Sequence, residues 1–169
     1  MSLQRVCVYC ASSSQCDAFY FEETRRLGAE LARHGLTIVF GGGSVGLMGA
    51  LADSALAAGG KVIGVLPHFM MIEKSQGLIA LPGGSGTLEE LFEAITWKRL
   101  GLHTHPIVIV NLRGFFDPAL ELLERCIRER FMRPQHRLMW SVVDSVDGVI
   151  GALHNAPPWD RNAMPEARV

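Results

Sequence analysis

The sequence has no hydrophobic run that approaches the roughly 20 residues needed by a membrane-spanning helix. Its first residues, MSLQRVCVYCASSS, hold too short an apolar stretch for a secretory signal peptide. The net charge is only −1 at pH 7, which leaves no overall field to recruit nucleic acid or an anionic membrane. These absences predict a cytoplasmic protein that binds neither nucleic acid nor membrane.

Cysteine is also scarce, with four residues in 169, as expected in a reducing compartment. Cys7 and Cys10 form a Cys-x-x-Cys, but in a predicted strand, where positions three apart point to opposite faces. A redox pair usually opens a helix, and a zinc site would need further ligands nearby, whereas the six histidines are scattered along the chain. We interpret both cysteines as buried structural thiols and expect neither a metal nor another cofactor.

What the sequence does have is an alternation of strand-like and helix-like segments. Strands are predicted at 5–11, 36–40, 61–67, 77–84, 106–112 and at the start of 139–154, and helices at 17–35, 47–60, 87–101, 117–131 and the end of 139–154. This order predicts an α/β fold, a Rossmann-like doubly wound parallel sheet in three α/β/α layers with strand order 3-2-1-4-5. We expect one Rossmann-like nucleotide-binding domain over 1–154 and a loose, Pro-rich tail over 155–169.

Three loops of small residues follow three of these strands: ASSS (11–14), GGGSVG (41–46) and PGGSGT (82–87). In such sheets ligands bind beyond the carboxyl ends of the strands, where the strand order reverses, so the loops should share one crevice. The 41–46 loop follows the second strand, whereas a nicotinamide-binding glycine loop follows the first, and no acidic residue ends the next strand to hold a ribose. Neither glycine loop ends in the Gly-Lys-Ser/Thr of a P-loop. Close packing between a strand and a helix remains an alternative explanation for the glycines of the 41–46 loop.

The loop at 82–87 has the composition of a phosphate site. Gly83, Gly84 and Gly86 let the backbone approach a ligand and can adopt turns closed to other residues. We expect Thr87 to cap the following helix, whose N-terminus carries partial positive charge. Backbone N–H groups, with the hydroxyls of Ser85 and Thr87, would then hold the phosphate.

Two glutamates stand directly after this loop, where an anion site does not obviously need them. Glu89 and Glu90 favour the positive end of the helix, which gives them a purely structural explanation. Glu90 would also lie about one helical turn from the phosphate, roughly the length of a sugar. A carboxylate there could bind ribose hydroxyls or stabilise positive charge on the sugar ring.

The connection between the third and fourth strands is unusually short. It has only PHFMMIEKSQG, where a parallel crossover normally takes a dozen or more residues and a helix. Eleven extended residues reach about 36 Å, so the link is possible. We expect it to leave one face of the sheet uncovered.

The long motifs together resemble a known family. Gly-Gly-Gly-x-x-Gly-Leu-Met-Gly falls on 41–49 and Pro-Gly-Gly-x-Gly-Thr-x-x-Glu on 82–90, with CVYCASSS before them and AITWKRLGLHTHPIVIVN after. This pattern, over about residues 4 to 150, is similar to the Lonely Guy (LOG) family of cytokinin riboside 5'-monophosphate phosphoribohydrolases, often mislabelled lysine decarboxylases. The resemblance implies a cofactor-free homodimer that hydrolyses the N-glycosidic bond of AMP or N6-modified AMP, giving free base and ribose 5-phosphate.

The resemblance also implies roles for single residues. Glu90 would be catalytic, in a transition state with oxocarbenium character. The expected substrate- and phosphate-binding residues are Ser12, Gly43, Met48, Gly83, Gly84, Ser85, Gly86, Thr87, Glu89 and Thr96. The natural base modification stays open.

One element of the family pattern has no counterpart. The family places a Met-His-x-Arg-Lys motif before the fourth strand, and its arginine is the partner of the catalytic glutamate; the short connection here lacks it. Either the natural protein carries on the order of 25 further residues at this point, enough for an ordinary crossover, or it has lost the activity. We favour the first, because every flanking motif is intact. The alternative function is a non-catalytic protein that binds a nucleotide or the molybdenum cofactor.

Overall fold

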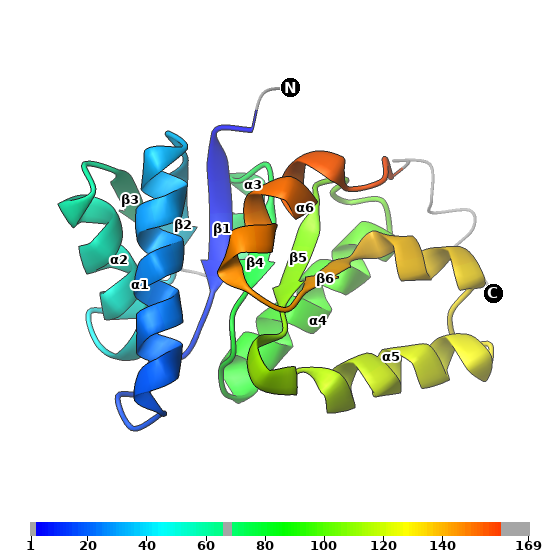
Figure 1. The fold of residues 1–169 in the computed structure, drawn as a ribbon. Coiled ribbons are helices and arrows are strands. Elements are labelled where there is room, and N and C mark those ends of the chain that lie inside the picture. Colours follow the sequence, from blue (N-terminus) through cyan, green and yellow to red (C-terminus); the bar gives the residue numbers. More distant parts are fainter. Residues whose placement is uncertain (1–2, 66–68, 160–169) are drawn as a thin grey trace.

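The computed structural model describes residues 3–65 and 69–159. Its single sheet is fully parallel, and the order β3-β2-β1-β4-β5-β6 confirms the prediction, with β6 added at the edge (Figure 1). The strands are β1 (Arg5–Tyr9), β2 (Thr37–Phe40), β3 (Lys61–Gly64), β4 (Leu78–Ala80), β5 (Ile107–Val110) and β6 (Ser141–Val143). The helices are α1 (Ala18–Arg33), α2 (Gly46–Ala57), α3 (Phe69–Glu73), α4 (Ser85–Arg99), α5 (Asp117–Arg128) and α6 (Val149–Asn155), with short 3-10 turns η1 (Leu112–Gly114), η2 (Pro134–Met139) and η3 (Val146–Gly148).

Helices cover both faces of the sheet, which confirms the three-layer prediction. Because side chains alternate along a strand, Val6 and Val8 of β1 pack under α1, α2 and α6, and Cys7 and Tyr9 pack under α3, α4 and α5. In Figure 1, α1 and α6 lie on the near face of the sheet. Both cysteines of the Cys-x-x-Cys are free and buried, as the sequence predicted.

The pair α1–α2 shows how local sequence sets this packing. Asp17 caps α1, because its Oδ1 accepts a hydrogen bond of 2.9 Å from the Phe19 N–H. Gly28 lets α2 approach closely, since a Cβ at this position would lie 2.6 Å from the Leu51 carbonyl oxygen. A side chain there would therefore separate the two helices.

The short crossover is closed by the five-residue α3, and residues 66–68 lie outside the described part of the chain. Met71 and Ile72 are buried in the same cluster as Val39, so α3 covers the sheet over β1 and β2. Beyond it, Lys61 is exposed and the Ile63 side chain keeps 37% exposure. The expected uncovered face is therefore limited to the edge strand β3.

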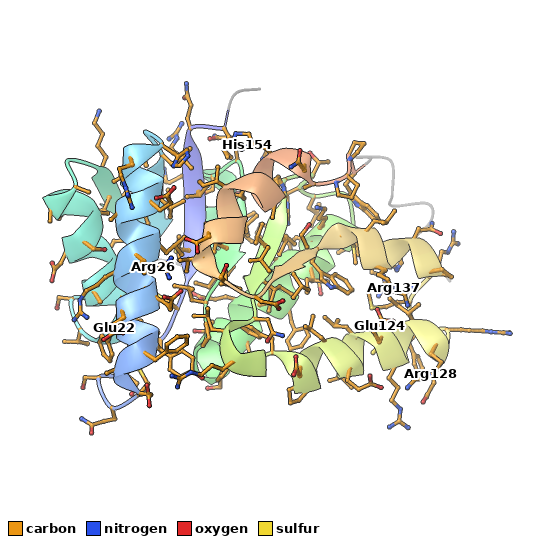
Figure 2. All side chains as sticks on the ribbon, viewed as in Figure 1. Glu22, Arg26, Glu124, Arg128, Arg137 and His154 are labelled. Atoms are coloured by element: carbon orange, nitrogen blue, oxygen red, sulfur yellow. The ribbon has the colours of Figure 1, made fainter. Side chains whose placement is uncertain are left out.

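An ion pair on the surface joins α5 to the turn η2. Figure 2 shows Arg137 of η2 beside Glu124 of α5, and the Arg137 Nε donates to the Glu124 Oε1 at 2.6 Å.

In the first part of the predicted tail, the Trp159 Nε1 donates to the Lys98 carbonyl at 2.7 Å; residues 160–169 are not described. Across residues 3–65 and 69–159, no helix has both the length and the apolar character to span a membrane.

Lys98 is buried, and its Nζ donates a 2.9 Å hydrogen bond to the His105 carbonyl. Burial lowers the pKa of Lys98 to about 8. Between pH 8 and the ordinary lysine value, the unfolded chain keeps a proton that the folded chain has lost, so stability rises with pH. Between pH 7 and pH 10, we expect the free energy of unfolding of the wild type to rise by about 2–3 kcal/mol relative to that of the Lys98→Met variant.

Urea unfolding at both pH values measures this difference. Lys61→Met is the matched control, because Lys61 is exposed and its removal should leave the pH dependence of the wild type unchanged. Parallel pH curves for the wild type and Lys98→Met would show that the buried ammonium carries no such cost.

Candidate functional site

A cavity of about 550 Å³ opens beyond the carboxyl ends of β1 and β4, the neighbouring strands at which the strand order reverses. The loop after β1 and the first turns of α4 meet there, as the crevice rule predicted. No residue of the third loop, 41–46, is part of the lining, which reaches α2 at Met48. The lining residues are Cys10, Ala11, Ser12, Ser13, Met48, Gly84, Ser85, Gly86, Thr87, Glu89, Glu90 and Glu93.

The loop before α2 packs closely against the serine loop at 11–14. Gly46 has φ +63°, and a Cβ on it would lie 2.4 Å from the backbone carbon of Ser12. The Met48 N–H donates to the Ala11 carbonyl at 3.2 Å. Gly43 does not line the cavity, but a Cβ there would lie 2.8 Å from the Met48 Sδ. Gly43 therefore leaves room for the side chain of Met48, and Met48 lines the cavity.

The helix α4 begins earlier than predicted. Its N-cap is Gly84, in extended conformation and without a side-chain capping bond, so the expectation that Thr87 caps the helix is wrong. Thr87 lies in the first turn and packs on Gly83, where a Cβ would come within 2.2 Å of its Oγ1. Gly83 faces a smaller apolar cavity of about 170 Å³ that also includes Gly84. Because the first N–H groups of a helix have no partner within the helix, those of this first turn can bind an anion.

The carboxylates lie further along α4 than this anion site. Glu89 is exposed at the cavity, and Glu90 is half-buried. Burial first and the charge of Glu90 second raise the pKa of the Cys10 thiol to about 12. Cys10 lines the cavity as a protonated thiol at neutral pH, so it is no nucleophile.

Thr96 lies away from the cavity. It is exposed on α4, and its Oγ1 donates to the Phe92 carbonyl at 2.8 Å. Glu93, by contrast, lines the cavity, although it belongs to none of the sequence motifs. Its spacing of three from Glu90 places both on one helix face, which is the signal that could have identified it.

The cavity has an unusual charge balance. Within the described part of the chain, its lining includes three glutamates and no lysine, arginine or histidine. Among residues 3–65 and 69–159, no group of three or more His, Cys, Asp or Glu side chains could hold a metal ion. An anion there would be held by backbone N–H groups and by the hydroxyls of Ser12, Ser13 and Ser85.

Comparison with known proteins shows which family shares this sequence. Residues 68–153 match the family model described as "Possible lysine decarboxylase", and residues 4–70 match that of the SLOG cluster4 family. The chain is 34% identical to the probable cytokinin riboside 5'-monophosphate phosphoribohydrolase LOGL5 of Oryza sativa subsp. japonica, covering 95% of this chain and 76% of that protein. It is 35% identical to LOG1 of Arabidopsis thaliana, over 92% and 84% of the two chains.

The chain belongs to the LOG family. The alignment with the rice relative runs over 188 positions, more than the 169 residues of this chain, so the relative has residues without a counterpart here. The two family models meet at residues 68–70, within the short crossover.

Solved structures show the same fold at low identity. The molybdenum cofactor carrier protein of Chlamydomonas reinhardtii superposes with a TM-score of 0.71 at 20% identity, covering 92% of this LOG-family chain and 98% of that protein. The molybdenum cofactor binding protein of Rippkaea orientalis superposes with a TM-score of 0.65, also at 20% identity, over 89% and 95%. At this identity the likeness concerns the fold alone.

Proposed function

We propose that this protein hydrolyses the N-glycosidic bond of AMP or an N6-modified AMP, releasing the free base and ribose 5-phosphate, and that it acts as a homodimer. The observation that carries the proposal is the single cavity that joins the N-terminus of α4 to Glu90, one helical turn further on. Relatives named as cytokinin riboside 5'-monophosphate phosphoribohydrolases support the substrate class.

In the proposed complex, the phosphate binds the N–H groups at the start of α4. The hydroxyls of Ser12, from the loop after β1, and Ser85, from the start of α4, line the same cavity and complete this subsite. The ribose then lies against Glu90. Placement of the two ends of one ligand by two fixed elements holds the glycosidic bond in a reactive geometry.

Glu90 acts on the sugar as the bond to the base breaks. Its carboxylate stabilises the positive charge that develops at C1', as carboxylates do in other glycoside cleavages. Water adds its oxygen to C1' and the departing base takes up a proton, so that the products are the neutral base and ribose 5-phosphate. Cys10 takes no part, because its thiol remains protonated.

Binding without cleavage is the second candidate function. It is favoured by the charge balance: no cation lines the described part of the cavity, and the arginine of the family motif has no counterpart in the chain. A carrier of a nucleotide, or of the nucleotide form of the molybdenum cofactor, needs the anion site and can do without that arginine.

The role of the phosphate gives the test of the proposal. We expect AMP to be cleaved at least about a hundredfold faster than adenosine in kcat/KM, because adenosine lacks the group that anchors the sugar at Glu90. Chromatography measures adenine and ribose 5-phosphate, with N6-isopentenyl-AMP run in parallel. Equal rates for AMP and adenosine would rule out the proposed phosphate subsite. Tight binding of AMP without any cleavage would favour the carrier.

A further inference from the structure

Three residues of the cavity lie in line along one face of α4. Gly86, Glu90 and Glu93 are separated by four and three positions, the spacing of neighbours on a helix surface, and all three line the cavity. At 1.5 Å per residue, Glu90 lies about 6 Å and Glu93 about 10 Å along the helix axis from Gly86. The cavity wall thus presents an anion site, one carboxylate and a second carboxylate in that order.

The carboxylate of Glu93 is placed to accept a hydrogen bond from a ligand. Its side chain is half-buried, whereas that of Glu89 is exposed. Glu93 lines the same cavity as Cys10 and Ala11, which directly follow β1, and its charge adds, after burial, Cys7 and Glu90, to the raised pKa of Tyr9. Among residues 3–65 and 69–159, no hydrogen bond or ion pair of Glu93 is found.

The order of groups along α4 matches the order of groups in a 5'-nucleotide. With the phosphate at Gly86 and the ribose at Glu90, the base comes next, opposite Glu93. Met48 lines the same cavity from α2 and offers an apolar side chain for a face of the base. An ionised carboxylate can only accept hydrogen bonds, so the base edge that meets Glu93 must present an N–H.

We propose that Glu93 is the residue that selects the base, favouring nucleotides whose base carries an exocyclic amino group with at least one N–H. Adenine meets this requirement, and so does adenine with a single N6 substituent. A 6-oxo base such as hypoxanthine has an oxygen at C6, where the carboxylate repels it, and keeps only its ring N1–H as a donor. An N6,N6-dialkyl adenine has no N–H left to donate on this edge. The inference rests on the nucleotide site of the proposed function.

A comparison of nucleotides that differ only at C6 tests the inference. We expect the wild type to prefer AMP over IMP, and AMP over N6,N6-dimethyl-AMP, by about 30- to 100-fold in kcat/KM, the range for a lost hydrogen bond to a charged group. In Glu93→Gln the amide can donate to an oxo group as well as accept, so the AMP/IMP preference should fall to within about threefold. Glu89→Gln is the matched control and should keep the wild-type preference.

Dissociation constants from calorimetry with the same nucleotides separate this inference from the proposed function. Binding with the expected preference, lost in Glu93→Gln but without any cleavage, would overturn the hydrolase and keep Glu93 as the base-selecting residue. An unchanged AMP/IMP preference in a folded Glu93→Gln would overturn the role of Glu93 and leave the hydrolase. Failure of the wild type to bind any of the nucleotides would overturn both.

Discussion

Glu90→Gln should lower the kcat of adenine release from AMP by about a thousandfold, within the usual range for a removed catalytic carboxylate, and leave KM nearly unchanged. Glutamine keeps the size and hydrogen-bonding reach of glutamate but loses the negative charge. The lost charge matters most in the transition state, where C1' becomes positive, and much less when the neutral sugar binds. Steady-state kinetics on both proteins measures the two constants separately.

Glu89→Gln provides the comparison. Both residues line the cavity on the same helix, so the two variants remove the same charge from nearby places. Only Glu90 lies on the face of α4 that continues from Gly86 to Glu93. A loss in kcat of similar size in both variants would mean that the general negative potential of the cavity acts on the sugar, rather than the carboxylate of Glu90.

Gly46→Ala should cost about 3–5 kcal/mol of folding stability, as expected when strain and a backbone clash combine. The residue has φ +63°, and its new Cβ would lie 2.4 Å from both the carbon and the oxygen of the Ser12 carbonyl. Either the serine loop or the start of α2 must move, and both line the cavity. Urea unfolding measures the stability, and calorimetry measures the accompanying loss of AMP affinity.

Gly59→Ala separates the two causes. Gly59 has φ +77°, but a Cβ there would meet no atom within 4 Å. This variant should lose only the cost of the left-handed backbone, about 1–2 kcal/mol, and keep its AMP affinity. Equal losses in the two alanine variants would show that the contact between Gly46 and Ser12 does not hold the cavity together.

Much of the fold followed from the alternation of strands and helices in the sequence. The order of the first five strands and the meeting of the serine loop with α4 were predicted, because both depend on chain connectivity and on handedness common to α/β sheets. The start of α4 was misplaced. The helix begins at Ser85 because Gly84 adopts an extended conformation, and a Ser-Gly-Thr sequence permits a cap at more than one residue.

The site was predicted less completely than the fold. Glycine motifs indicated where an anion could bind, but they could not show that Gly43 acts through Met48 or that Thr96 bonds back to its own helix. Glu93 belongs to none of the motifs, and its place in the cavity depends on which face α4 turns toward the loop after β1. Side-chain contacts of this kind depend on packing, which spacing along the chain does not determine.

The most direct test of the central claim is adenine release from AMP by the purified natural protein, with its intact mass measured alongside. The account predicts equal amounts of adenine and ribose 5-phosphate, and a mass above the 18.5 kDa of the 169-residue chain, because the crossover arginine of the family is expected to be present. No release from a protein of 18.5 kDa that still binds AMP would contradict the hydrolase and leave a nucleotide-binding protein.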